Sequence, residues 1–348
     1  MAVATGRSTL SERQLNRALL ARQSLLERAN KSIPKMLEAM GGLQAQYAPS
    51  MYIGLWSRMS RFDRDDLTRA LERRSVVQGT LLRSTIHLVS AHDYAPFAAA
   101  IGDERRKWWL KTHKHVATAK QMEAAARKLR KALGSKTMQR SEIDDLLGKP
   151  IAGGIGLWID LVRVPPSGTW EHRRADLYAA ADRWIDQKQI SGSDATKHLV
   201  KSYLRGFGPA PVKDIAGWAG IGPKAVAATV EEMRLRRFSN EQGDELVDLP
   251  RAPLPDPDVP APVRFLPTWD ATLLVHARRT GILPEEYRSL VFDPKTPHSV
   301  PVFLVDGRVA GKWRYVKGAV QIEAFARLSR AAKSAVEEEA DALAEFHS

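Results

Sequence analysis

The chain has 348 residues and a formal net charge of +13, from 53 Lys and Arg against 40 Asp and Glu. It contains no cysteine, which excludes disulfides, thiolate metal sites and a cysteine nucleophile. No segment has the length and apolar character of a membrane span or a signal peptide, so we expect a cytoplasmic protein with no membrane anchor.

The first elements expected are two helices. Residues 8–30 carry leucines close to helical spacing, which predicts one long helix. Ser32 can cap a second helix, with Pro34 tolerated in its first turn. Gly41 and Gly42 are good helix stoppers, so this helix should end there.

Two glutamines, Gln44 and Gln46, follow the glycine pair directly. Side chains two residues apart diverge on a helix but point the same way on an extended segment. The extended reading places two neutral carboxamides side by side, able to hold one water or the edge of one base. The alternative from this segment alone is a pair of ordinary polar loop residues.

A third helix should begin after Asp63, and residues 80–89 then alternate like a strand. One face of that strand would carry Arg83, Thr85 and His87. Three helices followed by a strand pair is the order of a winged helix, whose wing could contact DNA through these residues. For His87, a hydrogen bond to the backbone is an equal alternative, and Arg83 should contact phosphate.

Residues 101–140 form the most basic part of the chain, with twelve Lys and Arg against three acidic residues. Such a stripe favours a polyanion, most often nucleic acid, over a merely solvated helix face. Arg105, Arg106, Lys107 and Lys111 are therefore expected to contact phosphates. The adjacent Trp108 and Trp109 favour core packing over base stacking.

Two further helix-turn-helix units are predicted. One includes residues 141–148, and the clearer one spans 211–233, with a break at Gly220 and a second helix opened by Pro223. Lys197 and Lys201 share one helix face and, with Lys213, are further candidates for phosphate contacts.

The remaining chain should form a linker and a β-rich module. Residues 249–263 carry six prolines, which predicts an extended linker. Residues 302–313 read as two strands around an Asp306-Gly307 hairpin turn, and a final helix is expected at about 322–346.

The stretch around the glutamines, Leu37 to Pro49, resembles the AlkZ type of winged-helix DNA glycosylases. Residues 265–270 and 307–314 resemble the same family, so the likeness spans nearly the whole chain. The family excises bulky alkylated purines and unhooks DNA crosslinks, often as self-resistance to azinomycin-like genotoxins. Gln-x-Gln is its catalytic signature, and a sister branch carries Gln-x-Asp. The resemblance implies that Gln44 and Gln46 are catalytic.

The chemistry of a glutamine pair restricts the substrate. A carboxamide has no useful pKa and cannot act as a strong general base, but its carbonyl can orient a water. Such help is sufficient only when the leaving group is already good, as in cationic N7-alkylguanine or N3-alkyladenine. We therefore expect a monofunctional glycosylase that needs no cofactor or metal, with Gln46 positioning the water and Gln44 assisting, although the sequence does not rank the two.

The fold class expected is α+β, mainly α, with three tandem winged-helix units and a C-terminal β-rich module. The boundaries are 1–100, 101–165, 166–248 and 249–348. The partner is double-stranded DNA carrying alkylated purines, bound by a monomer at the bacterial nucleoid. The main rival is a non-catalytic winged-helix regulator, which would bind one operator sequence and release no base. A toxin-sequestering protein is a weaker alternative.

Overall fold

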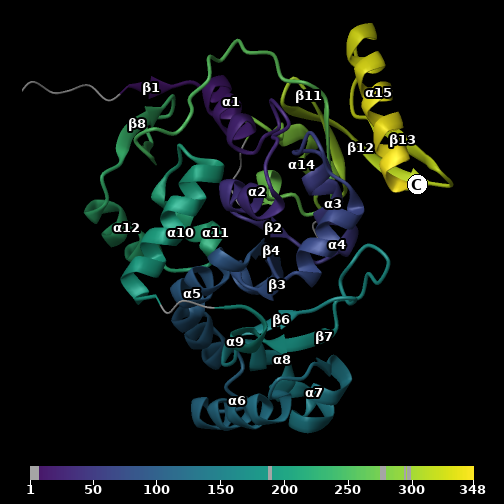
Figure 1. Ribbon diagram of the computed structural model, residues 1–348. Helices are drawn as coiled ribbons and strands as arrows, with labels where there is room; N and C mark the ends of the chain where they lie inside the picture. Colours follow the sequence, from purple (N-terminus) through teal and green to yellow (C-terminus); the bar gives the residue numbers. More distant parts are fainter. Residues whose placement is uncertain (1–7, 187–189, 275–279, 294, 296–298) are drawn as a thin grey trace, which may run out of the picture.

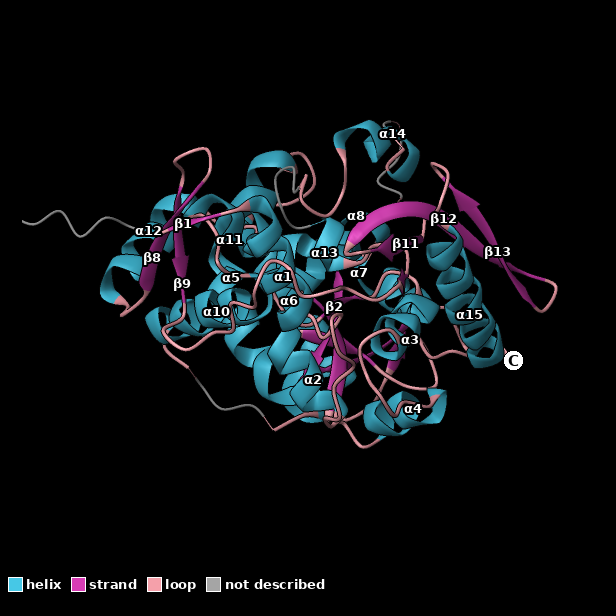
Figure 2. Cartoon of the chain, turned by 90° about the horizontal axis from the view of Figure 1, so that it is seen from above, coloured by secondary structure: helices cyan, strands magenta, loops and turns pink. Residues whose placement is uncertain are grey.

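The structure, a computed structural model, describes residues 8–186, 190–274, 280–293, 295 and 299–348. Figures 1 and 2 show how they are arranged. Helices hold 49% of the residues and strands 18%, so the prediction of a mixed, mainly helical fold is confirmed. Among the described residues, no helix is long and apolar enough to cross a membrane.

A six-stranded sheet lies at the centre of the molecule (Figure 1), with the order β2-β4-β3-β6-β7-β5. The sheet combines strands from both sides of residue 100, where the sequence analysis placed the boundary between the first two winged-helix units. The strands are β2 (Leu43–Gln44), β3 (Val76–Thr80), β4 (Ile86–Ser90), β5 (Met138–Gln139), β6 (Leu161–Arg163) and β7 (Leu177–Ala180).

The helices before the basic stripe differ from the prediction in two places. The first, α1 (Glu12–Arg22), ends well before residue 30, where Ser24 has a left-handed backbone (φ 54°). The second, α2 (Ile33–Met40), begins after Ser32 as predicted, but the Ser32 side chain makes no capping hydrogen bond. The helix α3 (Ala48–Trp56) was not predicted from the sequence. The helix α4 (Arg64–Glu72) follows the Asp63 cap as expected.

The helices that follow lie to the left of the sheet and below it in Figure 1. They are α5 (Ala91–Thr112), α6 (Ala119–Leu133), α7 (Arg140–Leu147), α8 (Lys149–Gly154), α9 (Ala181–Trp184), α10 (Gly192–Phe207), α11 (Val212–Ala219) and α12 (Pro223–Glu232). The predicted helix-turn-helix is confirmed in α11 and α12, which Gly220 separates with a left-handed backbone (φ 74°). The strands β8 (Arg236–Asn240) and β9 (Glu245–Asp248) come next, and β1 (Thr9–Leu10) adds to β8.

The C-terminal part contains a four-stranded antiparallel sheet of β10 (Arg264–Leu266), β11 (Val302–Val305), β12 (Arg308–Val316) and β13 (Ala319–Ala324). The linker at 249–263 has no helix or strand, and the hairpin at Asp306-Gly307 is confirmed. The final helix was predicted too early. Residues 319–324 pair with β12, and α15 (Arg330–His347) starts after Ser329, whose hydroxyl accepts from the Ala332 amide. The short helices α13 (Ala271–Leu274) and α14 (Arg288–Val291) lie between β10 and β11 in sequence.

One apolar core joins the N-terminal helices to this C-terminal sheet. Leu37, Met40 and Leu43 share a buried cluster with Phe265 and Phe303. Burying one such side chain stabilises the fold by about 1.5–3 kcal/mol. Two buried ion pairs, Arg22–Asp248 and Arg58–Asp270, also link distant parts of the chain. The segment that follows α2 is therefore anchored to the core through Leu43.

Candidate active site

The glutamine segment lies at the edge of the central sheet. Gly41 and Gly42 both adopt left-handed backbone conformations (φ 81° and 80°), and a Cβ on Gly42 would lie 2.9 Å from the Val89 side chain. Only glycine suits this tight approach. The turn places Gln44 opposite His87 on β4, and the Ala45 amide donates to the Ile86 carbonyl at 2.8 Å. The predicted extended backbone is thus confirmed at Gln44, and the chain bends at Gln46.

The two glutamine side chains lie together, as the spacing predicted. Gln44 is buried, whereas Gln46 is exposed, and the Gln44 Nε2 donates to the Gln46 Oε1. Arg83 contacts the other end of the buried amide, with its Nη2 donating to the Gln44 Oε1 at 2.9 Å. Three side chains therefore form one hydrogen-bonded row that ends at the surface.

Arg83 fixes the orientation of the buried amide. A guanidinium only donates, so the oxygen of Gln44 must face Arg83 and its nitrogen must face Gln46. That nitrogen then polarises the Gln46 carbonyl, whose oxygen retains a second lone pair. The exposed carbonyl is therefore a pre-oriented acceptor for a water.

The segment around Arg83 is not the predicted continuous strand. β3 and β4 pair with each other, and a short 3-10 helix (Leu82–Ser84) connects them. Arg83 itself has a left-handed backbone (φ 51°), a conformation that the alternating pattern does not indicate. Its Nη1 donates to the Trp218 carbonyl at 2.6 Å. Burial lowers the pKa of Arg83 to about 10, so the side chain stays cationic at neutral pH.

His87 is not on an exposed wing, contrary to the DNA-facing alternative. The ring is 3% exposed, and its Nδ1 lies 3.1 Å from the Thr85 carbonyl, so this nitrogen carries the proton. The Thr85 hydroxyl in turn donates to the Leu82 carbonyl at 3.1 Å. Burial, and then the charge of Arg83, lower the pKa of His87 to about 3. The hydrogen bond to the backbone is therefore the correct reading.

This buried histidine predicts a loss of stability in acid. Between pH 6.5 and 3 the unfolded chain protonates His87 and the folded chain does not, so stability falls as pH falls. At pH 5 the loss from this residue alone should be about 2 kcal/mol. Urea unfolding at pH 7 and pH 5 measures it. His87→Asn keeps an N–H donor but does not titrate. The difference in its free energy of unfolding between pH 7 and pH 5 should therefore be smaller than the wild-type difference by that amount. An unchanged difference would contradict the assignment.

The basic residues of α5 divide into buried and exposed ones. Arg105 is 5% exposed, and its Nη1 donates to the Thr80 carbonyl at 2.7 Å, so it supports the turn and does not lie on a DNA-facing surface. Arg106 is half-buried beside Asp103, whereas Lys107 and Lys111 are exposed. The neighbouring Trp109 is buried as expected, but Trp108 is 54% exposed.

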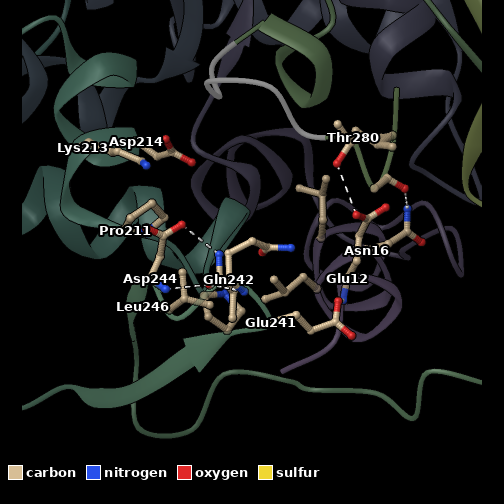
Figure 3. Close-up of a pocket in the computed structure, with 16 residues that line it drawn as sticks. Glu12, Asn16, Pro211, Lys213, Asp214, Glu241, Gln242, Asp244, Leu246 and Thr280 are labelled. Carbon is tan, nitrogen blue, oxygen red and sulfur yellow. Dashed lines mark hydrogen bonds between the residues drawn. The ribbon is translucent and has the colours of Figure 1, made fainter. Parts of the chain in front are cut away.

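The remaining lysine candidates lie on α10 and α11. Lys197 pairs with Glu232 at 2.9 Å, and Lys201 is exposed on the same helix. Lys213 lines a pocket of about 380 Å³ shown in Figure 3. The same pocket carries four carboxylate residues, and these disfavour a phosphate there: Glu12, Asp214, Glu241 and Asp244.

Another cluster, which the sequence did not reveal, joins α5 to α10. The Asp93 Oδ1 lies 3.1 Å from the His92 Nδ1 and 2.8 Å from the His198 Nε2. Burial raises the pKa of Asp93, but the contacts with His198 and His92 outweigh it and the net shift is downward. The three potential ligand atoms lie within 4.8 Å of one another, which is close enough for a metal ion. The hydrogen bonds of Asp93 to the two histidines already explain why these side chains lie together.

Comparisons with known proteins agree with this architecture. A family model described as DNA glycosylase AlkZ-like matches residues 37–346. A relative from Streptomyces sahachiroi, named an interstrand DNA cross-link repair glycosylase, is 23% identical over 362 residues, covering 95% of each chain. The solved structure of the Streptomyces sahachiroi DNA glycosylase AlkZ has a TM-score of 0.83 at 20% identity and covers 97% of each chain. The fold is therefore shared over nearly the whole length.

Proposed function

Because the chain belongs to the AlkZ-like DNA glycosylase family, we propose that it hydrolyses the N-glycosidic bond of cationic alkylated purines in double-stranded DNA. Gln46 holds the attacking water near C1′, and Gln44 holds Gln46. The row from Arg83 through Gln44 to the exposed Gln46 carries this proposal. It supports a ranking of the two glutamines, with Gln46 as the catalytic residue and Gln44 as the positioning residue.

The reaction follows from the chemistry of a neutral site. The Gln46 carbonyl accepts a hydrogen bond from the water and directs its lone pair toward the sugar, and the amide dipole favours the developing sugar cation. The cationic purine takes the electrons of the breaking C1′–N bond and leaves as a neutral base. Oxygen from the water adds to C1′ and its proton passes to solvent, which leaves an abasic site.

An exposed Gln46 also supports bulky lesions as substrates. The side chain lies at the surface and not at the bottom of a deep base-flipping pocket, so a large adduct has room beside it. The relative from Streptomyces sahachiroi is named for interstrand cross-link repair. We extend this activity to the present chain as part of the proposal.

The proposed enzyme acts as a monomer built from tandem winged helices. The helix-turn-helix of α11 and α12, followed by the β8 and β9 hairpin, supports this organisation in its third unit. Lys107, Lys111 and Lys201 are exposed and are the proposed phosphate contacts. A non-catalytic DNA-binding protein is the second candidate, favoured by that same helix-turn-helix.

Base release from a duplex holding one N7-methylguanine tests the function, with strand scission at the abasic site as the readout. Release above the spontaneous rate is expected. If none occurs, a second duplex with a bulky N7 adduct separates a narrower glycosylase from the DNA-binding candidate. Absence of release from both, together with tight binding to one operator sequence, would establish the rival.

Arg83→Lys tests the positioning of the amide row. Lysine keeps the charge but cannot bridge the Gln44 oxygen and the Trp218 carbonyl with a planar fork, so Gln44 loses its fixed orientation. We expect kcat to fall roughly tenfold, about the effect of one lost hydrogen bond to a charged group, with KM for DNA nearly unchanged. A rise in KM at constant kcat would instead indicate a phosphate contact. Arg69→Lys, on the exposed face of α4, is the matched control.

A further inference from the structure

The residue after Gln46 lines a pocket. Tyr47 is 40% exposed and lies at the rim of a cavity of about 260 Å³. The other walls come from α3, from the residues that follow β10 and precede β11, from the segment between β6 and β7, from β12 and from the end of α15. Small-molecule sites typically have volumes of roughly 300–1,000 Å³, so this cavity, which is slightly smaller, suits only a compact group.

Ring-bearing side chains form part of the walls, from Tyr47, Trp170, Trp313, Tyr315 and His347. The Tyr315 and His347 rings are stacked with centroids 4.2 Å apart, and Trp170 meets His347 edge-on at 5.2 Å. Trp313 is fixed by its indole N–H, which donates to the Leu266 carbonyl at 3.0 Å. Flat, rigid walls of this kind favour a planar guest, because stacking of a base on an aromatic side chain contributes roughly 1–3 kcal/mol.

Two buried polar atoms among the lining residues have no hydrogen-bond partner. They are the Ser50 Oγ and the His347 Nε2. Both atoms are buried behind the pocket wall, so a guest in the cavity does not contact them, and the choice of guest rests on the ring-bearing walls.

The charges around the cavity exclude a cationic guest. Arg173 and Arg314 are exposed lining residues, and the Arg173 Nη1 donates to the Tyr47 hydroxyl at 3.2 Å. Burial, and then the charges of Arg64 and Arg173, lower the pKa of His347 to about 4, so its ring is neutral at neutral pH. A positively charged purine would be repelled here, whereas a neutral ring system would not.

We propose that this aromatic pocket holds the neutral, planar ring system attached to a bulky purine adduct, while the purine itself lies at Gln46. Tyr47, which follows Gln46 in the chain and lines the pocket, is the specificity-determining residue. The inference rests on the proposed glycosylase function and names the class of adduct that the enzyme prefers. Stacking in the pocket binds the adduct and orients the glycosidic bond against the Gln46 water.

The test compares two duplexes that differ only in the N7 substituent of one guanine, either methyl or quinolinylmethyl. The measured quantity is the ratio of kcat/KM for the quinolinylmethyl adduct to that for the methyl adduct. Tyr47→Ala should lower this ratio roughly tenfold, and Tyr47→Phe should keep it because the ring remains. Leu290→Ala, which removes an exposed apolar side chain outside the pocket, is the control. Thermal melting followed by circular dichroism verifies that each variant is folded.

The outcomes are separable. If Tyr47→Ala is folded and leaves the ratio unchanged, or lowers both rates equally, the pocket does not select the adduct and the inference is wrong. If the wild-type protein releases neither adduct, the proposed function fails instead.

Discussion

Gln46→Ala is expected to lower kcat for release of N7-methylguanine by roughly 100-fold, about the effect of removing one preorganised dipole from a catalytic site. The carbonyl of Gln46 would otherwise hold the water, and nothing else in the Arg83–Gln44 row reaches as far toward the surface. Single-turnover kinetics on a lesion duplex measure the chemical step directly. Stability should change little, because the side chain is exposed.

Gln44→Ala provides the comparison within the pair. Its loss should lower kcat less than Gln46→Ala, since the water ligand remains and only its orientation is lost. It should also destabilise the fold by about 1–3 kcal/mol, because removal of the buried amide leaves Arg83 without one of its acceptors. Gln242→Ala, an exposed amide outside the site, controls for amide loss in general. Near wild-type excision by both active-site variants would refute the assignment.

Arg58→Ala is expected to cause the largest loss of stability, about 3–5 kcal/mol. The side chains of Arg58 and Asp270 are completely buried, with the Nη2 and Oδ1 atoms 2.9 Å apart. Removing the guanidinium leaves the Asp270 carboxylate in the interior without its charged partner. Urea unfolding followed by tryptophan fluorescence would measure the change.

Arg69→Ala is the matched control for this ion pair. Arg69 pairs with Asp66 on the exposed face of α4, where both side chains are more than two-fifths exposed. Exposed ion pairs contribute only about 0–1 kcal/mol, so the urea midpoint of Arg69→Ala should shift little. Equal shifts for the two variants would contradict the role assigned to the buried pair.

Local signals in the sequence predicted the parts of the fold that depend on neighbouring residues. Ser32 and Asp63 begin helices, Gly41 ends one, and Asp306-Gly307 forms a hairpin turn. Each of these effects acts within one turn of backbone. The same locality predicted the pairing of Gln44 with Gln46, because spacing on an extended segment determines which side chains meet.

The rest of the site depends on contacts that spacing does not reveal. Arg83 reaches the carbonyl of Trp218, 135 positions later in the chain, and its left-handed backbone has no sequence signature in a non-glycine residue. His87 and Arg105 are polar residues in buried positions, where composition predicts exposure. The aromatic pocket is assembled from six separate segments, at residues 47–53, 170–173, 267–268, 301, 313–315 and 347, so no single stretch identifies it.

The position of the motif on a two-residue edge strand predicts which of its glutamines tolerates a carboxylate. Gln46 follows β2 and is open to water, so a carboxylate there keeps its hydration and leaves the strand pairing intact. Gln44 is enclosed and supplies an N–H to its neighbour, which an ionised carboxylate cannot do. The second position of the motif therefore tolerates a carboxylate, and the first does not.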